Sequence, residues 1–401
     1  MSTPTIDPRK LSTGLDAVVT AATSGEHRLP GVVAGVTTAA DDIYLSSAGL
    51  RSLDDDATPM TADSVFAIFS ATKAITATVA LQLVERGQLD LDAPAKEYVP
   101  LLGLVRVIEG FEENGEPRLR APKTDLTTRQ LLTHTAGFGY DFFNETYAQL
   151  SRAGWMPNIA TATLDALTTP LLFDPGTSWE YGSNLDWVGL IVEAVTGARL
   201  GDVMSEHLFS PLGMSDTDFE LSADQRERRA VLHQRKPDGS LKPNHRFAQP
   251  TDPEIQMGGQ GLYSTVRDYL AFCRMWLRGG LSDSGEQILR PGTVAEATRN
   301  QLGDLKIHEL PGVIPSLAND AEFFPGLPKS WSLAFMVNDD DAPTGRRAGS
   351  SAWAGLANLY YWIDPISGIA GFWATQILPF ADPATLEHYL DFEAATYRAL
   401  G

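Results

Sequence analysis

Ser70-Ala71-Thr72-Lys73 is the only place in the 401 residues of this chain where a serine stands three positions before a lysine. Residues three apart share one face of a helix, so we expect the Lys73 side chain to lie beside that of Ser70. A serine hydroxyl is a poor nucleophile at neutral pH unless a neighbouring base accepts its proton. Lysine can be that base only if burial or a nearby group lowers its pKa. The stretch therefore predicts a nucleophilic serine paired with a buried lysine.

The flanking sequence predicts a buried helix that begins at this serine. Residues 65–69 form a dense apolar run, and residues 70–86 contain neither Gly nor Pro until Gly87 closes the segment. A wide apolar face follows, formed by Ile75, Val79, Leu81, Leu83 and Val84. A serine in the first turn of such a helix lies near exposed backbone N–H groups, which favour the negative charge that develops during acyl transfer.

A second short motif, Tyr181-Gly182-Ser183, supplies a candidate proton carrier. If the fold brings Tyr181 to the pair of Ser70 and Lys73, the three side chains form a relay in which Lys73 helps to keep the phenol oxygen partly anionic. The motif alone is weak, because Tyr44-Leu45-Ser46 fits the same pattern and lies in a predicted hairpin strand.

Four motifs occur in a fixed order along the chain: residues 70–73, residues 131–137 (Leu-Leu-Thr-His-Thr-Ala-Gly), residues 181–183, and residues 258–268, which begin Gly-Gly-Gln-Gly. Together they resemble the serine β-lactamase and penicillin-binding protein superfamily, and within it the class C-like esterases, known as family VIII carboxylesterases. The resemblance spans roughly residues 10 to 400, which is one whole catalytic unit in that family.

The resemblance implies roles for individual residues. Ser70 would be the acylated nucleophile, Lys73 its proton partner and Tyr181 the general acid and base. The backbone N–H groups of Ser70 and Leu356 would form the oxyanion hole. His134, within the second motif, is expected to be structural.

Two departures from the family pattern bear on the substrate. The lactamase pattern is Tyr-x-Asn, whereas here Ser183 takes the third position and Asn184 falls one residue late. The Lys-Thr-Gly motif of a sheet-edge strand is best matched by residues 353–355, Trp-Ala-Gly, which carry no cation. A tryptophan there removes a charge-assisted contact to a substrate carboxylate and adds an apolar wall suited to neutral esters. The predicted substrate-binding residues are Trp353, Gly355, Ser183, Tyr140 and Phe138, although Trp353 and the aromatic residues 138–143 could instead be core.

The order of predicted elements indicates an α+β fold of the β-lactamase and transpeptidase type, an antiparallel sheet flanked by helices with an inserted helix-rich domain. Strands are predicted at 32–37, 43–46, 331–337, 358–363 and 369–376, and helices at 185–195, 201–208, 266–277 and after 382. We therefore assign 1–85 and 300–401 to a discontinuous sheet domain and 86–299 to the helix-rich domain, with the catalytic cleft between them. Segments 103–125 and 232–257 are interpreted as excursions.

Composition and charge limit the partners, the location and the cofactors that we expect for this protein. The formal charge of −20 argues against nucleic acid or an anionic membrane. Residues 1–25 lack the pattern of a secretion signal, and no apolar run is long enough to span a membrane. Cys273, the only cysteine, is expected to be buried in a helix, which fits a cytoplasmic protein. No zinc-binding histidine pattern, α/β-hydrolase elbow or nucleotide loop occurs, so we expect no metal and no cofactor.

Two classes of function fit these observations. The first is a serine hydrolase that cleaves a small-molecule, short-chain carboxylic ester through an acyl-enzyme on Ser70; β-lactamase, D-amino acid peptidase, amide hydrolase and acyltransferase activities share this chemistry and stay open. The second is a non-catalytic binding or scaffold member of the fold. The joint presence of Ser70, Lys73 and Tyr181 argues against the second. The sequence does not indicate the oligomeric state.

Overall fold

The structure is a computed structural model that describes residues 7–25, 28–54, 58–247 and 249–400. Residues 1–6, 26–27 and 55–57 of the predicted sheet segment 1–85, residue 248 of the segment 86–299, and residue 401 of the segment 300–401 lie outside the described residues.

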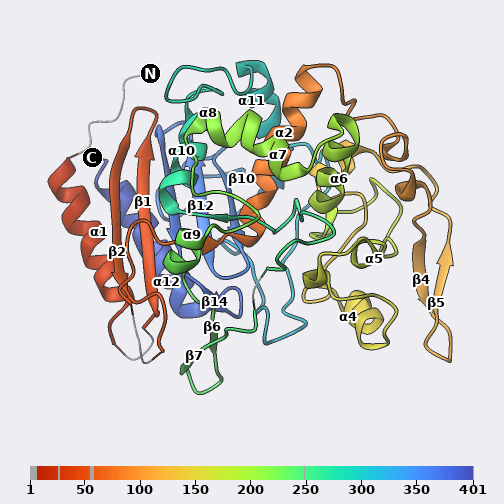
Figure 1. The fold of residues 1–401 in the computed structure, drawn as a ribbon, viewed down its shortest axis with the longest axis horizontal. Coiled ribbons are helices and arrows are strands. Elements are labelled where there is room, and N and C mark those ends of the chain that lie inside the picture. Colours follow the sequence, from red (N-terminus) through yellow and green to blue (C-terminus); the bar gives the residue numbers. More distant parts are fainter. Residues whose placement is uncertain (1–6, 26–27, 55–57, 248, 401) are drawn as a thin grey trace.

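A seven-stranded antiparallel sheet forms the centre of the molecule, in the order β2-β1-β13-β12-β11-β10-β9 (Figure 1). Strand β1 pairs with β13 from Val33 opposite Ala374 to Thr38 opposite Ile369, so the two ends of the chain close one sheet. This arrangement, and the α+β class, agree with the sequence prediction. The strands are β1 (Gly31–Thr38), β2 (Asp42–Gly49), β9 (Lys329–Trp331), β10 (Met336–Asn338), β11 (Ser351–Gly355), β12 (Leu359–Asp364) and β13 (Ile369–Ala374).

Helices cover both faces of this sheet. Neighbouring residues of a strand point to opposite faces, and in β13 Phe372 packs on Tyr269 of α10 (Val266–Leu277), with ring centroids 4.5 Å apart. The next residue, Trp373, packs at 5.5 Å on Phe392 of α12 (Pro383–Arg398). Helix α1 (Pro8–Ala22) lies beside α12 on the same face (Figure 1).

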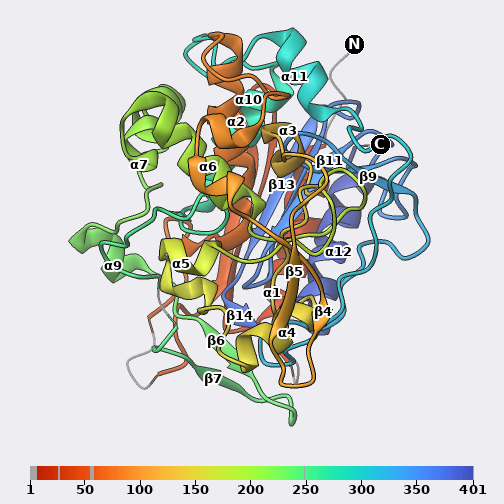
Figure 2. The ribbon, with the colours of Figure 1, turned by 90° about the vertical axis from the view of Figure 1, so that its right-hand side faces the viewer.

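The predicted helix after Ser70 is confirmed. A short 3₁₀ turn, η1 (Phe69–Ala71), leads into α2 (Thr72–Glu85), and Gly87 takes a positive φ of 70° just beyond the end of the helix. Nearly all of α2 is buried, including its polar residues Lys73, Thr76 and Gln82. It packs against α6 (Asn184–Thr196), as both ribbon views show (Figures 1 and 2).

The rest of the chain is made of short elements. The helices are α3 (Thr128–Leu132), α4 (Glu145–Arg152), α5 (Leu164–Leu167), α7 (Leu200–Met204), α8 (Ser210–Leu212), α9 (Ala223–Arg228) and α11 (Pro291–Thr298). Single turns are η2 (Ala95–Glu97), η3 (Pro100–Gly103), η4 (Ile159–Thr161) and the π-helical η5 (Ser205–Phe209). The small strands are β3 (Phe66–Ala67), β4 (Val107–Phe111), β5 (Pro117–Arg120), β6 (His233–Arg235), β7 (Leu241–Pro243), β8 (Tyr263–Ser264) and β14 (Ile377–Leu378).

The structure corrects one predicted strand and adds detail to the predicted excursions and domains. The strand predicted at 331–337 is split into β9 and β10, because Ser332 forms a turn in which its hydroxyl oxygen accepts the backbone N–H groups of Ala334 and Phe335. The excursions 103–125 and 232–257 contain the hairpin strands β4 and β5 and the hairpin strands β6 and β7. Helix α10 falls in the segment 86–299 that we assigned to the helix-rich domain, yet it packs on the sheet. The division into two domains stays a prediction.

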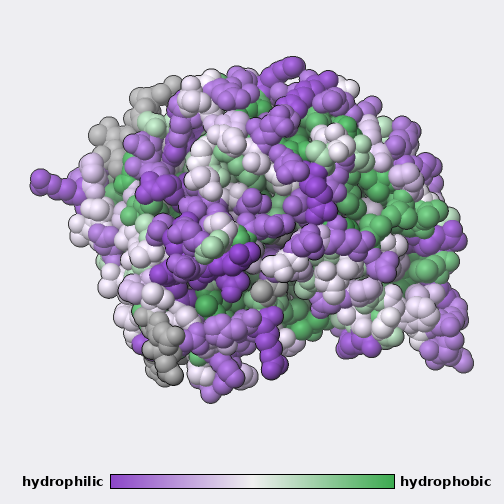
Figure 3. Space-filling model, viewed as in Figure 1, coloured by the Kyte–Doolittle hydropathy of each residue, from purple (hydrophilic) through white to green (hydrophobic). Residues whose placement is uncertain are grey.

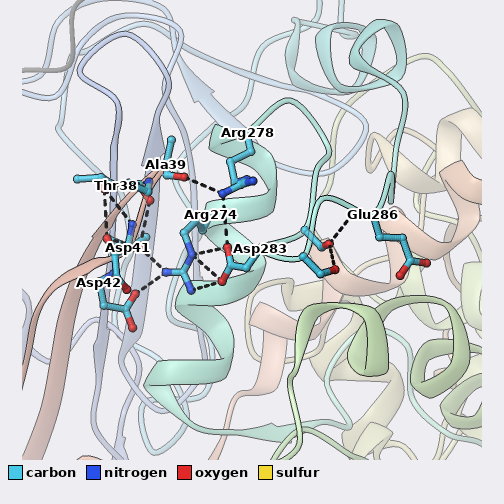
Figure 4. Close-up of polar contacts among 12 residues, drawn as sticks. Thr38, Ala39, Asp41, Asp42, Arg274, Arg278, Asp283 and Glu286 are labelled. Carbon is cyan, nitrogen blue, oxygen red and sulfur yellow. Dashed lines mark hydrogen bonds and ion pairs between the residues drawn. The ribbon is translucent and has the colours of Figure 1, made fainter.

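Helix α10 is tied to the β1–β2 hairpin by a buried guanidinium (Figure 4). Arg274 donates from Nη1 to Thr37 Oγ1 and to Asp42 Oδ1, each at 2.6 Å, and from Nη2 to Asp283 Oδ2 at 2.8 Å. Its neighbour Cys273 is fully buried, as predicted. The cluster joins a helix of the middle of the chain to the N-terminal strands.

The face seen in Figure 3 is mostly hydrophilic, with hydrophobic residues showing toward the end where β4 and β5 lie. The large apolar side chains exposed among the described residues include Leu104, Leu119 and Trp155. Within the same described ranges no helix is both long and apolar enough to cross a membrane.

Candidate active site

Ser70, in the turn η1, and Lys73, in the first turn of α2, lie side by side, as the spacing predicted. Lys73 Nζ is 3.0 Å from Ser70 Oγ. The residue before the serine, Phe69, has a φ of 44°, a strained left-handed conformation for a residue with a side chain, and such strain is often found at functional sites. Ser70 itself is partly exposed, so a substrate can reach its hydroxyl.

The Lys73 amine is buried, and it has two further partners. It lies 2.8 Å from the carbonyl oxygen of Gly259 and 3.1 Å from the hydroxyl of Tyr140. Burial lowers the pKa of Lys73 to about 7, against the opposing charge of Asp186. Charged, the amine donates to all three neighbours; neutral, it keeps two N–H donors and gains a lone pair that can accept the proton of Ser70.

Tyr181 reaches the same place, but not in the state that we expected. Its hydroxyl accepts a hydrogen bond of 2.9 Å from Trp353 Nε1, and its ring centroid lies 4.8 Å from Lys73 Nζ. Burial raises the pKa of Tyr181 well above its usual value, although hydrogen bonds with Ser70 and Trp353 oppose this. This shift favours a neutral phenol, a proton donor, over the partly anionic phenol that we predicted.

The loop after β11 brings the predicted oxyanion groups to Ser70. Leu356 and Gly355 line the pocket at Ser70 together with Trp353. A Cβ at Gly355 would lie 2.4 Å from the carbonyl oxygen of Ile68, so only glycine lets β11 approach the turn before Ser70 this closely. Within the part of the chain that the structure describes, the backbone N–H groups of Ser70 and Leu356 have no hydrogen-bond acceptor. Two free donors beside the nucleophile are what an oxyanion hole requires.

The Trp-Ala-Gly segment lies on β11, which is not an edge strand. Strand β10 pairs with its first two residues, Ser351 and Ala352, and ends there, so residues 353–355 extend past it and have one free side. Within the described ranges, residues 353–355 are therefore unpaired on one side, although the first part of β11 is paired on both sides.

Three of the predicted substrate-binding residues line the pocket and two do not. Trp353, Gly355 and Tyr140 are in its wall. Phe138 is fully buried and stacks on Trp187 at 5.8 Å, and Ser183 is buried where α6 begins, so both are corrections to the sequence prediction.

The asparagine beside this motif faces away from the pocket as well. Asn184 Nδ2 donates to the carbonyl oxygen of Phe138 at 3.2 Å and lies 3.0 Å from Nδ1 of His134. Burial, with the charge of Lys73, lowers the pKa of His134 well below its usual value. Asn184 and His134 therefore have structural roles, as we expected for His134.

Sequence reasoning missed Asp186. Its carboxylate is buried, its Oδ1 accepts the backbone N–H of Gly259 at 2.7 Å, and its Oδ2 has no hydrogen-bond partner among the described residues. Since the carbonyl of Gly259 accepts from Lys73, Asp186 holds in place the group that orients the amine. The sequence contained two signals: the Gly-Gly-Gln-Gly run, and an acidic residue shortly after Tyr181. Only the folded structure shows that they are in contact.

No group of three or more His, Cys, Asp and Glu side chains is arranged to hold a metal ion within the described ranges. The chemistry that the site offers is that of its own side chains: a hydroxyl nucleophile, a buried amine and a neutral phenol.

Comparison with known proteins shows the family of this chain. The family model described as Beta-lactamase matches residues 15–396, and the chain belongs to that family. It is 32% identical over 358 residues to the Monacolin J acid methylbutanoyltransferase of Aspergillus terreus, covering 84% of this chain and 83% of the relative. It is 30% identical over 350 residues to the lovastatin esterase of Penicillium rubens, and the match covers 84% of this chain and 86% of that relative.

Among solved structures, Simvastatin Synthase (LovD) from Aspergillus terreus, as its LovD6 mutant, matches with a TM-score of 0.85 at 28% identity over 98% of both chains. The chain is therefore an enzyme of the serine hydrolase and acyltransferase fold.

Proposed function

We propose that this enzyme cleaves short-chain carboxylic esters through an acyl-enzyme on Ser70, and that water or an alcohol then takes the acyl group. The observation that carries the proposal is the buried amine of Lys73, whose pKa is lowered, 3.0 Å from the Ser70 hydroxyl. A base held at this distance can accept the serine proton as the hydroxyl attacks a carbonyl carbon.

Acylation would use all three side chains. Neutral Lys73 takes the proton of Ser70 as Oγ bonds to the ester carbon, and the N–H groups of Ser70 and Leu356 bind the oxyanion. The ester C–O bond then breaks as the Tyr181 hydroxyl gives its proton to the departing alcohol. The acyl-enzyme is left with a cationic lysine and a phenolate.

Deacylation reverses these proton transfers. The Tyr181 phenolate takes a proton from the incoming water or alcohol, whose oxygen bonds to the acyl carbon. Ser70 Oγ leaves and regains its proton from Lys73. The products are an acid or a new ester, and every group returns to its starting state.

Acyl transfer to an alcohol is the second candidate, and the names of the relatives favour it. Several of them, at 29–32% identity, are named acyltransferases, and one is named an esterase. The acyl-enzyme is common to both reactions, so the acceptor alone separates them.

The other activities of the fold have less support. Trp353 stands where a lysine would face a substrate carboxylate, and its indole N–H is engaged by Tyr181, which disfavours β-lactams and peptides with a free carboxylate. A non-catalytic scaffold would have no use for a buried lysine in contact with a serine, because burying an amine in its charged form destabilises the fold.

Release of p-nitrophenol from p-nitrophenyl butyrate tests the proposal. Wild type is compared with Ser70→Ala, Lys73→Ala and Tyr181→Phe, with and without an added alcohol, and a chromogenic cephalosporin is tested in parallel. We expect no turnover by Ser70→Ala, and a loss of about 10²-fold to 10⁴-fold for each of the other two variants. Butyrate ester of the added alcohol would identify transfer, and butyric acid alone would identify hydrolysis. Undiminished turnover in Ser70→Ala would contradict the proposal.

A further inference from the structure

Beside the pocket at Ser70 lies a much larger cavity, here called the side cavity. It has a volume of about 410 Å³, whereas the pocket at Ser70 has about 20 Å³. A single water needs about 10–15 Å³ by the same measure, so the pocket at Ser70 has room for one small group only. The bulk of any larger substrate therefore lies in the side cavity. The two spaces share Phe142, Gln260 and Leu356, which form the neck between them.

The side cavity has a mixed lining. Apolar side chains, among them Phe69, Ile159 and Leu317, form one part of its wall, and neutral polar side chains, among them Asn158, Thr161 and Gln249, form another. Two charged residues also line it: Asp141, which is buried, and Arg246, which is exposed. Such a lining suits an apolar body that carries a few hydrogen-bonding groups.

Gln260 is the polar side chain at the neck, and its amide is free. Among the described residues no hydrogen bond is made by its side-chain oxygen or nitrogen, and the side chain is partly exposed to the two spaces. Asn158 has its side-chain oxygen engaged by the N–H of Ala160, and Gln249 uses its amide to donate to the carbonyl oxygen of Gln260 at 2.9 Å. Of these three amides, that of Gln260 has both its oxygen and its nitrogen without a partner among the described residues, and it is the one at the neck, beside the pocket at Ser70.

The backbone of Gln260 is held firmly. Its N–H donates to the carbonyl oxygen of Met257 at 3.1 Å, and its carbonyl accepts from Gln249. The preceding residue, Gly259, is fixed by Lys73 on one side and Asp186 on the other. A side chain on so rigid a support can hold a ligand group in a defined position relative to Ser70.

We propose that the side cavity binds the alcohol part of the ester and that the Gln260 amide hydrogen-bonds a second polar group on that alcohol. This inference rests on the proposed function, in which the acyl group is short, and it places that group in the pocket at Ser70. The larger alcohol then extends past the neck, and its hydroxyl, ether or carbonyl oxygen reaches the Gln260 side chain. The preferred substrates are esters of a bulky, mainly apolar alcohol with a hydrogen-bonding group.

A matched pair of esters isolates this contact. Tetrahydropyran-4-yl butyrate and cyclohexyl butyrate have the same shape and differ by one ring oxygen, which can accept a hydrogen bond. For each enzyme the ratio of the two kcat/KM values is measured by butyrate release, which cancels differences in the amount of active protein. The variants are Gln260→Met, of similar length without an amide, and Gln260→Glu, whose carboxylate cannot donate to an ether. Gln149→Met, an exposed glutamine on α4, is the matched control.

The wild-type ratio is expected to exceed the ratio of both Gln260 variants by about fivefold, the usual effect of one neutral hydrogen bond. Gln149→Met should keep the wild-type ratio. A second pair, the p-nitrophenyl esters of tetrahydropyran-4-carboxylic and cyclohexanecarboxylic acids, places the oxygen in the acyl group instead. An unchanged ratio in the Gln260 variants, or a change in the acyl pair alone, overturns the inference. Absence of any ester turnover by wild type overturns the proposed function itself.

Discussion

Burial decides the protonation of the side chains around Ser70. It lowers the pKa of Lys73 to about 7 and raises the pKa values of Tyr140 and Tyr181 well above their usual range. The same low-polarity surroundings therefore give a lysine that is neutral in part at neutral pH and two phenols that keep their protons. In this account Lys73 is the base of acylation and Tyr181 the acid.

The pH dependence of kcat/KM follows from this assignment. Only the neutral amine can take the proton of Ser70, so kcat/KM should rise with pH through about 7 and level off above it. The negative charge of Asp186 raises the pKa of Lys73, so removing that charge should lower it. Asp186→Asn, whose side-chain oxygen can still accept from Gly259, should therefore move the rise toward lower pH. A pH profile of p-nitrophenyl butyrate hydrolysis checks this, and an unmoved rise would exclude the proposed electrostatic role of Asp186.

Trp353 is expected to act through its N–H as well as through its surface. Its Nε1 donates a hydrogen bond to the Tyr181 hydroxyl. This hydrogen bond is expected to stabilise the phenolate that forms when Tyr181 gives up its proton. Trp353→Phe keeps an aromatic ring and loses the donor, so kcat should fall by about tenfold or more while KM changes little, as for a hydrogen bond to a charged group. Steady-state kinetics on p-nitrophenyl butyrate measure the two parameters. A change in KM alone would assign Trp353 to substrate binding only.

At the scale of elements, the loop at residues 257–262 is fixed to two helices. From α2, Thr76 Oγ1 donates to the carbonyl oxygen of Gly258 at 2.6 Å, and Lys73 donates to that of Gly259. From α6, Asp186 accepts the N–H of Gly259. The loop thus links the helix that carries the nucleophile to the helix that follows Tyr181, and it carries Gln260 to the neck of the site.

Gly259→Ala tests this linkage. A Cβ at this position would lie 2.5 Å from Asp186 Oδ2, closer than real contacts allow, so the loop or the helix must move. Turnover of p-nitrophenyl butyrate and the Tm should both fall. The control is Gly14→Ala in α1, where nothing lies within 4 Å and alanine should stabilise the helix by about 1 kcal/mol. Wild-type turnover in Gly259→Ala would contradict the role given to the loop.

The cluster at Arg274 should matter for stability rather than for chemistry. Arg274→Ala leaves the mostly buried carboxylate of Asp42 without its cation, and unpairing a buried charge costs about 3 kcal/mol of unfolding free energy. The matched control is Arg299→Ala, whose ion pair with Glu296 is exposed and should contribute little. Urea unfolding compares the two. Equal midpoints for both variants would remove the cluster from the account of how α10 is held on the sheet.

At the scale of the whole molecule, the sequence predicted those features that depend on residues close together in the chain. Apolar runs and helix boundaries located α2, α6, α10 and α12, and the strands at both ends of the chain indicated one closed sheet. The contact of Lys73 with Ser70 followed from helix geometry alone.

The remaining features come from tertiary approach, which no local pattern encodes. Asp186 accepts a hydrogen bond from the backbone of Gly259, and the indole of Trp353 donates one to the hydroxyl of Tyr181. Both contacts join residues that are far apart in the sequence. The state of Tyr181 was missed because its burial comes from the whole assembly. Phe138 and Ser183 were misplaced because proximity in sequence to site residues does not decide which side chains face the pocket.

The most direct measurement of the central claim is covalent trapping. The wild-type enzyme is treated with a p-nitrophenyl phosphonate, digested and analysed by peptide mass spectrometry, beside Ser70→Ala and Lys73→Ala. The account predicts one adduct per chain, on Ser70, formed more slowly by about 10²-fold or more in Lys73→Ala and absent in Ser70→Ala. An adduct on another residue, or none on folded wild-type protein, would contradict the assignment of Ser70 as the nucleophile.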